Sequence, residues 1–94
     1  MSLKVNYSQA SNQEEAYNLG KQAVTPEYVA KFNVKADVTT DDGNFSMQAK
    51  GKGFELKLKF EDSYCLVDLD LSFMLKPLKG KILETIENKI KKTV

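Results

Sequence analysis

The chain has 94 residues, which is enough for one small domain with a modest hydrophobic core and leaves no room for two. It is 41% hydrophobic and 29% charged with a net charge of +1, which is typical of folded globular proteins and unlike disordered ones. Histidine and arginine are both absent, so the commonest general base and the side chain best suited to binding bases and phosphates are missing. We therefore expect a single domain over 1–94 that is neither an enzyme nor a nucleic-acid-binding protein.

The sequence also predicts the compartment. No stretch approaches the roughly 18–20 consecutive apolar residues that a membrane-spanning helix needs, and the longest apolar run is 73–75. No charged-then-apolar leader of the secretory kind is present, so we expect a cytoplasmic protein without a transmembrane segment. The single cysteine, Cys65, falls in an apolar segment and is expected to be buried, which agrees with a reducing compartment.

The N-terminal part of the chain predicts one strand and two helical segments. Apolar and polar residues alternate up to Tyr7, which indicates a short half-buried strand. Ser11 precedes Glu14 by three residues, the spacing of a capping box, and predicts the start of a helix. Pro26 is incompatible with the interior of that helix but suits a first turn. We therefore expect a break there, followed by a second short helical segment that ends near Phe32.

Four further strands are expected as antiparallel hairpins, because apolar residues occupy every second position between turn motifs. The turn motifs are at 41–44, 51–53 and 61–63. The apolar faces are expected to consist of Val34, Ala36 and Val38; Phe45, Met47 and Ala49; Phe54, Leu56, Leu58 and Phe60; and Cys65, Val67, Leu69 and Leu71. The resulting sheet has one dry face and one wet face.

The last predicted element is an amphipathic helix over 75–92. Its apolar stripe includes Leu78, Ile82 and Ile86, and we expect this stripe to complete the core. Gly80 is an internal weak point that we expect to allow a close approach to the sheet. The complete order is β-α-β-β-β-β-α, an α+β fold. One face of its antiparallel sheet is covered by a proline-interrupted N-terminal helix and a long C-terminal helix.

Two pairs of acidic residues are the only candidates for catalysis or metal binding. Asp68 and Asp70 share the outer face of their strand, and Lys57 and Lys59 are expected opposite them in cross-strand ion pairs. A paired-carboxylate acid–base site would need burial, which a wet face does not offer. The pair at 41–42 precedes a glycine and is interpreted as a turn, since the other ligands of a calcium loop are missing. We predict no catalytic, metal-binding or cofactor-binding residue.

Positive charge is concentrated in the C-terminal helix. Residues 76–92 carry a net charge of +4, whereas the rest of the chain carries −3. A basic amphipathic helix suits a membrane surface, a polymer surface or an anionic partner. A core-completing helix with solvated lysines explains the same pattern, so both interpretations stay open. The candidate interaction surface consists of Lys76, Lys79, Lys81, Lys89, Lys91 and Lys92.

Residues 71–82, Leu-Ser-Phe-Met-Leu-Lys-Pro-Leu-Lys-Gly-Lys-Ile, and the apolar spacing that continues to Ile90 resemble the C-terminal signature of a small bacterial family. This family is the polyhydroxyalkanoic acid system proteins, also called granule-region proteins. The similarity extends over nearly the whole chain, although it is most specific in the C-terminal helix. Many members carry a histidine between the first strand and the first helix, where this chain has Tyr7-Ser8-Gln9, so no role of that histidine is transferred.

The resemblance implies a non-catalytic accessory protein of polyhydroxyalkanoate metabolism, which contacts the granule surface or another granule protein. It implies no catalytic residue and no cofactor. Two alternatives stay open. A long helix over an antiparallel sheet also resembles, in outline, the helix-grip lipid-binding modules, although a chain of this size leaves little volume for a cavity. A homodimer formed through a sheet edge or the terminal helix is the other alternative.

Overall fold

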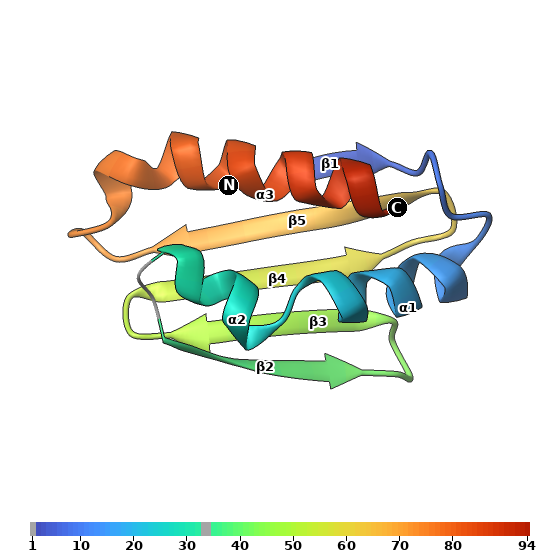
Figure 1. Ribbon diagram of the computed structural model, residues 1–94, viewed down its shortest axis with the longest axis horizontal. Coiled ribbons are helices and arrows are strands. Elements are labelled where there is room, and N and C mark those ends of the chain that lie inside the picture. Colours follow the sequence, from blue (N-terminus) through green and yellow to red (C-terminus); the bar gives the residue numbers. More distant parts are fainter. Residues whose placement is uncertain (1, 33–34) are drawn as a thin grey trace.

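The computed structural model describes residues 2–32 and 35–94 and shows a five-stranded antiparallel sheet with helices packed on one face (Figure 1). The predicted α+β class, with an N-terminal helix and a long C-terminal helix, is confirmed. Val34, which the alternation assigns to the second strand, lies outside the described residues. The elements are β1 (Ser2–Asn6), α1 (Gln13–Ala23), α2 (Pro26–Val29), η1 (Ala30–Phe32), β2 (Ala36–Asp41), β3 (Ser46–Gly51), β4 (Phe54–Phe60), β5 (Tyr64–Leu71), η2 (Lys76–Leu78) and α3 (Lys79–Thr93).

The strands lie in the order β1-β5-β4-β3-β2. Short turns join β2 through β5 as consecutive antiparallel hairpins. β1 pairs with the free side of β5, so the chain crosses from one edge of the sheet to the other through α1 and α2 (Figure 1). This crossing lays α1 and α2 on the same face that α3 covers. The helices therefore form one layer, and the opposite face of the sheet is open.

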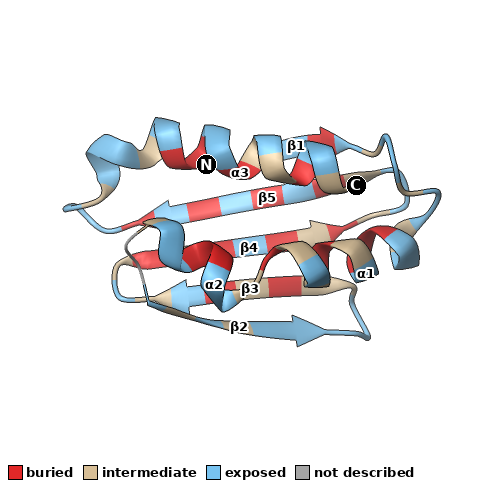
Figure 2. Cartoon of the chain, in the orientation of Figure 1, coloured by how far each residue is buried: buried red, intermediate tan, exposed pale blue. Residues whose placement is uncertain are grey.

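Strict alternation in the two central strands builds most of the core. The helix-facing side chains of β4 and β5 are at most 4% exposed, which confirms their predicted dry faces (Figure 2). They are Phe54, Leu56, Leu58, Phe60, Cys65, Val67, Leu69 and Leu71. Phe45 departs from the prediction because it precedes β3 instead of belonging to it. It adopts a φ of 50°, and its ring lies 5.5 Å from that of Tyr17.

The start of α1 is shifted by one residue from the predicted capping box, so the assignment of Ser11 as the cap is wrong. The cap is Asn12, whose side-chain oxygen accepts a hydrogen bond from the N–H of Glu15 at 2.8 Å. Glu15 in turn accepts a hydrogen bond at 3.0 Å from the N–H of Ser11, the residue before the cap, so the arrangement is close to a capping box. Further along, Pro26 opens α2 behind a break, as predicted, with Thr25 as its cap.

The C-terminal helix begins later than predicted. A 3₁₀ turn, η2, precedes it, and α3 starts at Lys79 instead of Leu75. Because of this offset Leu78 lies off the apolar stripe and is 51% exposed, so its predicted place in the core is wrong. The prediction for Gly80 is also wrong, because a Cβ at this position would meet no atom within 4 Å.

The rest of the α3 stripe packs over the sheet as predicted. Its members are at most 8% exposed: Ile82, Leu83, Ile86 and Ile90. At the end of the helix the backbone oxygen of Val94 accepts hydrogen bonds from the N–H groups of residues 8, 9 and 10 at 2.8, 2.7 and 2.8 Å. These contacts tie α3 to the segment that joins β1 to α1.

Buried ionisable side chains should make the protein less stable at alkaline pH. Burial raises the pKa of the Cys65 thiol from 9.0 to about 12, and burial is also the main cause that raises the pKa of Tyr17 and of Tyr28. The folded state therefore holds these protons more tightly than the unfolded state does. The resulting stabilisation is complete below the unfolded pKa and is lost as the pH rises through the folded one.

For the Cys65 thiol we expect the free energy of unfolding to fall by up to about 1.4 kcal/mol per pH unit above pH 9.0. Urea denaturation at a series of pH values measures this slope. The Cys65→Val variant should show a shallower fall just above pH 9.0, where the tyrosines contribute less. An equal slope in both proteins would contradict the assignment to this thiol.

Candidate interaction surface

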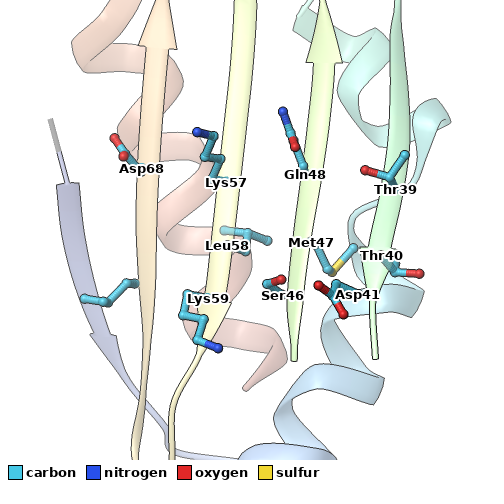
Figure 3. Close-up of a pocket in the computed structure, with 11 residues that line it drawn as sticks. Thr39, Thr40, Asp41, Ser46, Met47, Gln48, Lys57, Leu58, Lys59 and Asp68 are labelled. Atoms are coloured by element: carbon cyan, nitrogen blue, oxygen red, sulfur yellow. The ribbon is translucent and has the colours of Figure 1, made fainter. Parts of the chain in front are cut away.

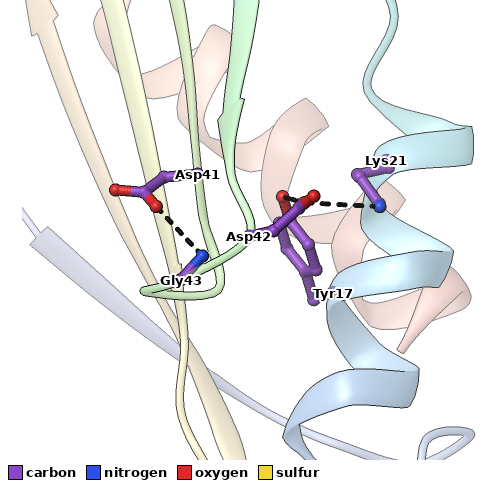
Figure 4. Close-up of polar contacts among 5 residues, drawn as sticks. All are labelled: Tyr17, Lys21, Asp41, Asp42 and Gly43. Carbon is purple, nitrogen blue, oxygen red and sulfur yellow. Dashed lines mark hydrogen bonds and ion pairs between the residues drawn. The ribbon is translucent and has the colours of Figure 1, made fainter.

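The acidic pair at 41–42 forms a turn, as predicted (Figure 4). Asp41 accepts a hydrogen bond from the N–H of Gly43 at 3.1 Å. Asp42 faces α1, where it accepts a hydrogen bond from the Tyr17 hydroxyl and pairs with Lys21 Nζ at 3.7 Å. The pair therefore closes the β2–β3 turn and joins it to α1. Within the described part of the chain, no three histidine, thiol or carboxylate side chains are grouped so that they could hold a metal ion.

The second acidic pair lies on the open face of the sheet. Lys57 is opposite Asp68, which agrees with the expected ladder of opposite charges, whereas Asp70 is opposite Glu55. The expected meeting of opposite charges is therefore wrong for Asp70 and for Lys59, because the register places Lys59 opposite Leu66. Beside Asp68 an open hollow of about 570 Å³ crosses β2 to β5 (Figure 3).

Polar side chains on and beside this hollow contact one another. Gln48 Nε2 donates a hydrogen bond to Glu55 at 3.0 Å, and Lys57 Nζ lies 3.5 Å from the other oxygen of the same carboxylate. Lys59 donates a hydrogen bond to the backbone oxygen of Asn44. These contacts satisfy much of the polar surface within the face itself, and both signs of charge are mixed there. The face has no excess of one charge that would select a ligand.

The candidate lysines form two groups at opposite ends of α3. Lys76, Lys79 and Lys81 lie at its start, and Lys89, Lys91 and Lys92 lie at its end. The helical rise places the groups roughly 15–20 Å apart. In the second group Lys89 Nζ lies 5.5 Å from the centroid of the Tyr28 ring, and Lys91 pairs with Glu87 at 3.4 Å. The predicted surface is thus divided, and its two halves have different surroundings.

The group at the start of α3 lies beside exposed apolar side chains. Phe73 is 87% exposed, Met74 is 86% exposed and Leu78 is 51% exposed. Among the described residues Leu66 is the one other exposed large apolar side chain; it is 37% exposed and lies on the open face of the sheet. In Figure 2 the connection from β5 to α3 is pale blue at one end of the molecule. We call Phe73, Met74 and Leu78 the apolar tip; clusters of this kind mark interaction sites.

Hydrogen bonds hold the turn that presents the apolar tip. The N–H of Ser72 donates to the backbone oxygen of Gly53 at 2.8 Å, and the backbone oxygen of Ser72 accepts from the N–H groups of Leu75 and Lys76 at 3.0 Å each. Leu75 is partly buried against the core. The turn is therefore fixed on both sides, while the two residues between Ser72 and Leu75 project into solvent.

Gly53 allows the close approach that this turn requires. Its φ is +73°, in the left-handed region, and a Cβ there would lie 2.5 Å from the Ser72 Oγ. Glycine is the residue that tolerates both the backbone angle and the contact. The β3–β4 hairpin and the β5–α3 turn are consequently packed together at one end of the sheet.

Lysines lie on the segments beside the apolar tip. A second hollow of about 570 Å³ opens beside it and is lined by Lys35, Lys52, Gly53, Ser72, Phe73, Met74 and Leu75. The two segments that meet here, 50–54 and 71–83, contain no aspartate or glutamate. We call five lysines at this end the basic collar: Lys35 and Lys52, which line the hollow, and Lys76, Lys79 and Lys81, which follow the apolar run 73–75 in the sequence. Half of the predicted lysine surface therefore belongs to a larger site that also includes apolar residues and two further lysines, Lys35 just before β2 and Lys52 in the β3–β4 turn.

The sequence pattern does not identify the apolar tip. Leu75 and Leu78 continue the helical spacing of the apolar stripe of α3 toward the N-terminus, so the pattern assigns both residues to the core. A usable signal does exist. The run 73–75 follows the last alternating residue, Leu71, and precedes Pro77, so at least part of it belongs to neither apolar face.

Comparisons of the chain with protein-family models, with curated proteins and with solved structures give no match. Because no match tests it, the resemblance of 71–82 to the polyhydroxyalkanoic acid system proteins stays a prediction. In the part of the chain that the structure describes, every helix is too short or too polar to cross a membrane.

Proposed function

We propose that this chain is a non-catalytic, cytoplasmic accessory protein that binds the surface of polyhydroxyalkanoate granules through the apolar tip and the basic collar. The exposure of Phe73 and Met74, at 87% and 86%, is the observation that carries the proposal. A granule presents an apolar surface to an aqueous compartment, and a fixed turn with two exposed apolar side chains is suited to it. The resemblance to granule-region proteins lies in 71–82, the segment that builds this surface.

The small-molecule alternative receives less support from the packing. A helix-grip site needs a cavity between the terminal helix and the sheet. Ile82, Ile86 and Ile90 fill that interface and are at most 5% exposed. The hollow on the open face and the hollow beside the apolar tip both lie outside this interface. The geometry therefore favours binding at a surface over enclosure of a ligand.

The homodimer alternative could use either edge strand of the sheet, β1 or β2, because each pairs with a neighbour on one side alone. The longer of the two is β2. Self-pairing centred on Thr39 would place Asp37 of each copy opposite Asp41 of the other. Like charges directly opposite destabilise an antiparallel pair, and charged residues commonly protect sheet edges. This charge pattern disfavours a dimer through β2 in that register.

Purified granules should retain the wild-type protein in a co-sedimentation assay, and the F73S/M74S variant should bind at least tenfold more weakly. Burying a phenylalanine or methionine side chain contributes roughly 1.5–3 kcal/mol, so the loss of two such contacts exceeds tenfold. Both residues are exposed, so the variant should fold normally, which circular dichroism verifies.

The matched control is Leu66→Ser, which removes an exposed apolar side chain from the open face of the sheet. This variant should bind granules as the wild-type protein does. Absence of wild-type binding would overturn the proposed function. Equal binding by F73S/M74S and the wild-type protein would show that the apolar tip is not the contact.

A further inference from the structure

The apolar tip and the basic collar together match the chemistry of a lipid–water interface. Phenylalanine and methionine partition into the apolar side of such an interface, and lysine places an ammonium group among the phosphates. Lysine also extends a flexible apolar stem along the boundary, so its charge stays in water while its carbons are buried. The site offers both components within one fixed turn and the elements beside it.

The position of this site suits a flat partner. The molecule is elongated, with a longest extent of 38 Å, and the connection from β5 to α3 lies at one end of that axis (Figure 1). The β3–β4 hairpin reaches the same end, where the N–H of Ser72 is bonded to Gly53. The apolar tip can therefore enter a surface while the helical layer and the open face of the sheet stay in water.

We infer that this end of the molecule inserts into an anionic phospholipid surface, with Phe73 and Met74 among the acyl chains and the basic collar at the headgroups. The inference rests on the proposed function for the location of its site, and it names the partner as lipid instead of the polyester. Bare polyester is uncharged and would use the apolar tip alone. An anionic lipid layer complements the apolar tip and the lysines together.

Charge complementarity is local to this end. The whole chain carries only +1, so its net charge gives little attraction to an anionic surface. Segments 50–54 and 71–83 lack acidic residues. On the sheet two carboxylates flank them, Glu55 and Asp70, and Glu55 is held by Gln48 and Lys57 on the open face. Each lysine near an anionic membrane strengthens binding by about fivefold. The second lysine group of α3 lies roughly 15–20 Å along the helix, beyond the Debye length of about 8 Å in physiological salt. Only the lysines of the basic collar are expected to contribute.

The test compares binding to two kinds of vesicle by co-sedimentation in physiological salt. One is phosphatidylcholine alone, and the other is an equal mixture of phosphatidylcholine and phosphatidylglycerol. The wild-type protein should bind the mixed vesicles at least tenfold more tightly. Both the F73S/M74S and the K76E/K79E variants should bind the mixed vesicles at least tenfold more weakly than the wild-type protein.

The matched control is K91E/K92E, which makes the same change of charge at the far end of the same helix. It should change the affinity for mixed vesicles by less than twofold, because these positions lie beyond the screening distance. A loss as large as that of K76E/K79E would show that net charge, and not this end, drives binding, and would overturn the inference. Raising the salt concentration should weaken the binding of the wild-type protein to mixed vesicles more than it weakens the residual binding of K76E/K79E.

The outcomes also separate the inference from the proposed function. Binding to granules and to bare polyester without binding to mixed vesicles would overturn the lipid partner and leave the granule role intact. Binding to mixed vesicles without binding to granules would uphold the inference and overturn the granule role. Equal affinity for neutral and anionic vesicles, or full binding by F73S/M74S, overturns the inference. Granule binding that is lost when granule proteins are stripped, together with no vesicle binding, would identify a protein partner and also overturn it.

Discussion

Replacement of Ile86 by alanine should lower the free energy of unfolding by about 2–5 kcal/mol. Ile86 is fully buried in the middle of the α3 stripe, where the helix covers the sheet. Removing its branched side chain leaves a cavity, because the close-packed sheet can only partly relax. Small domains have a total stability of about 5–15 kcal/mol, so the variant loses a large part of it. Urea denaturation followed by circular dichroism measures the change.

Leu78→Ala is the matched control, because helical spacing alone would place both residues on one buried stripe. Leu78 is half exposed at the end of η2, and its replacement should change stability by no more than about 0.5 kcal/mol. Similar losses at the two positions would contradict the observed start of α3. A small loss at Ile86 would contradict the role of α3 as the cover of the core.

Gly20→Ala should destabilise the protein even though alanine is the better helix former by about 1 kcal/mol. A Cβ at this position would overlap the Phe60 Cζ and lie 3.1 Å from the Phe60 Cε1. Phe60 is fully buried, and its ring makes an edge-on contact with Tyr17 at 6.0 Å, so it has little room to move. Overpacking of a core costs about 1–3 kcal/mol, which offsets the helical gain and leaves a net loss of up to about 2 kcal/mol.

Gly80→Ala should have the opposite effect on the free energy of unfolding, which urea denaturation measures for both glycine variants. A Cβ at this exposed helical position meets no atom within 4 Å, so alanine should stabilise the protein by about 0.4–1 kcal/mol. Gly20→Ala should destabilise the Phe60→Leu variant less than it destabilises the wild-type protein, because leucine lacks the ring atoms that the new methyl group meets. Stabilisation by Gly20→Ala would contradict the packing of α1 on β4.

The sheet could be predicted from the sequence because its pattern leaves a single solution. Apolar residues occupy every second position of 54–60 and of 65–71. A slip of one residue would expose the whole apolar set of a strand, so burial alone fixes the register. The pairing of Lys57 with Asp68 follows from the short turn between these strands. The order of the strands, with β1 beside β5, depends on how the helices cross the sheet and was not predicted.

The predictions failed where a local sequence pattern fits two structures equally well. Ser11 and Asn12 are equally good caps, and each precedes an acidic residue by three positions, so the motif at 11–15 fits two starts. Helical spacing extends back to Leu75, and no local feature shows that Leu78 lies outside the helix. The turn that displaces it depends on the bond between Ser72 and Gly53, a contact between distant segments.

The two roles of the C-terminal segment are separated along its length. The stripe that ends at Ile90 packs on the sheet, whereas the apolar tip precedes the first turn of α3. Substitutions at Phe73 and Met74 can therefore change binding without changing the core.

The most direct measurement of the role of the apolar tip uses tryptophan as a reporter. The chain contains no tryptophan, so Phe73→Trp places a single indole at the apolar tip, and Leu66→Trp places one on the open face of the sheet. On addition of purified granules we predict a blue-shifted emission and protection from an aqueous quencher for Phe73→Trp, and neither for Leu66→Trp. A shift at position 66 with none at position 73 would contradict the account, because it would place the contact on the opposite layer of the molecule.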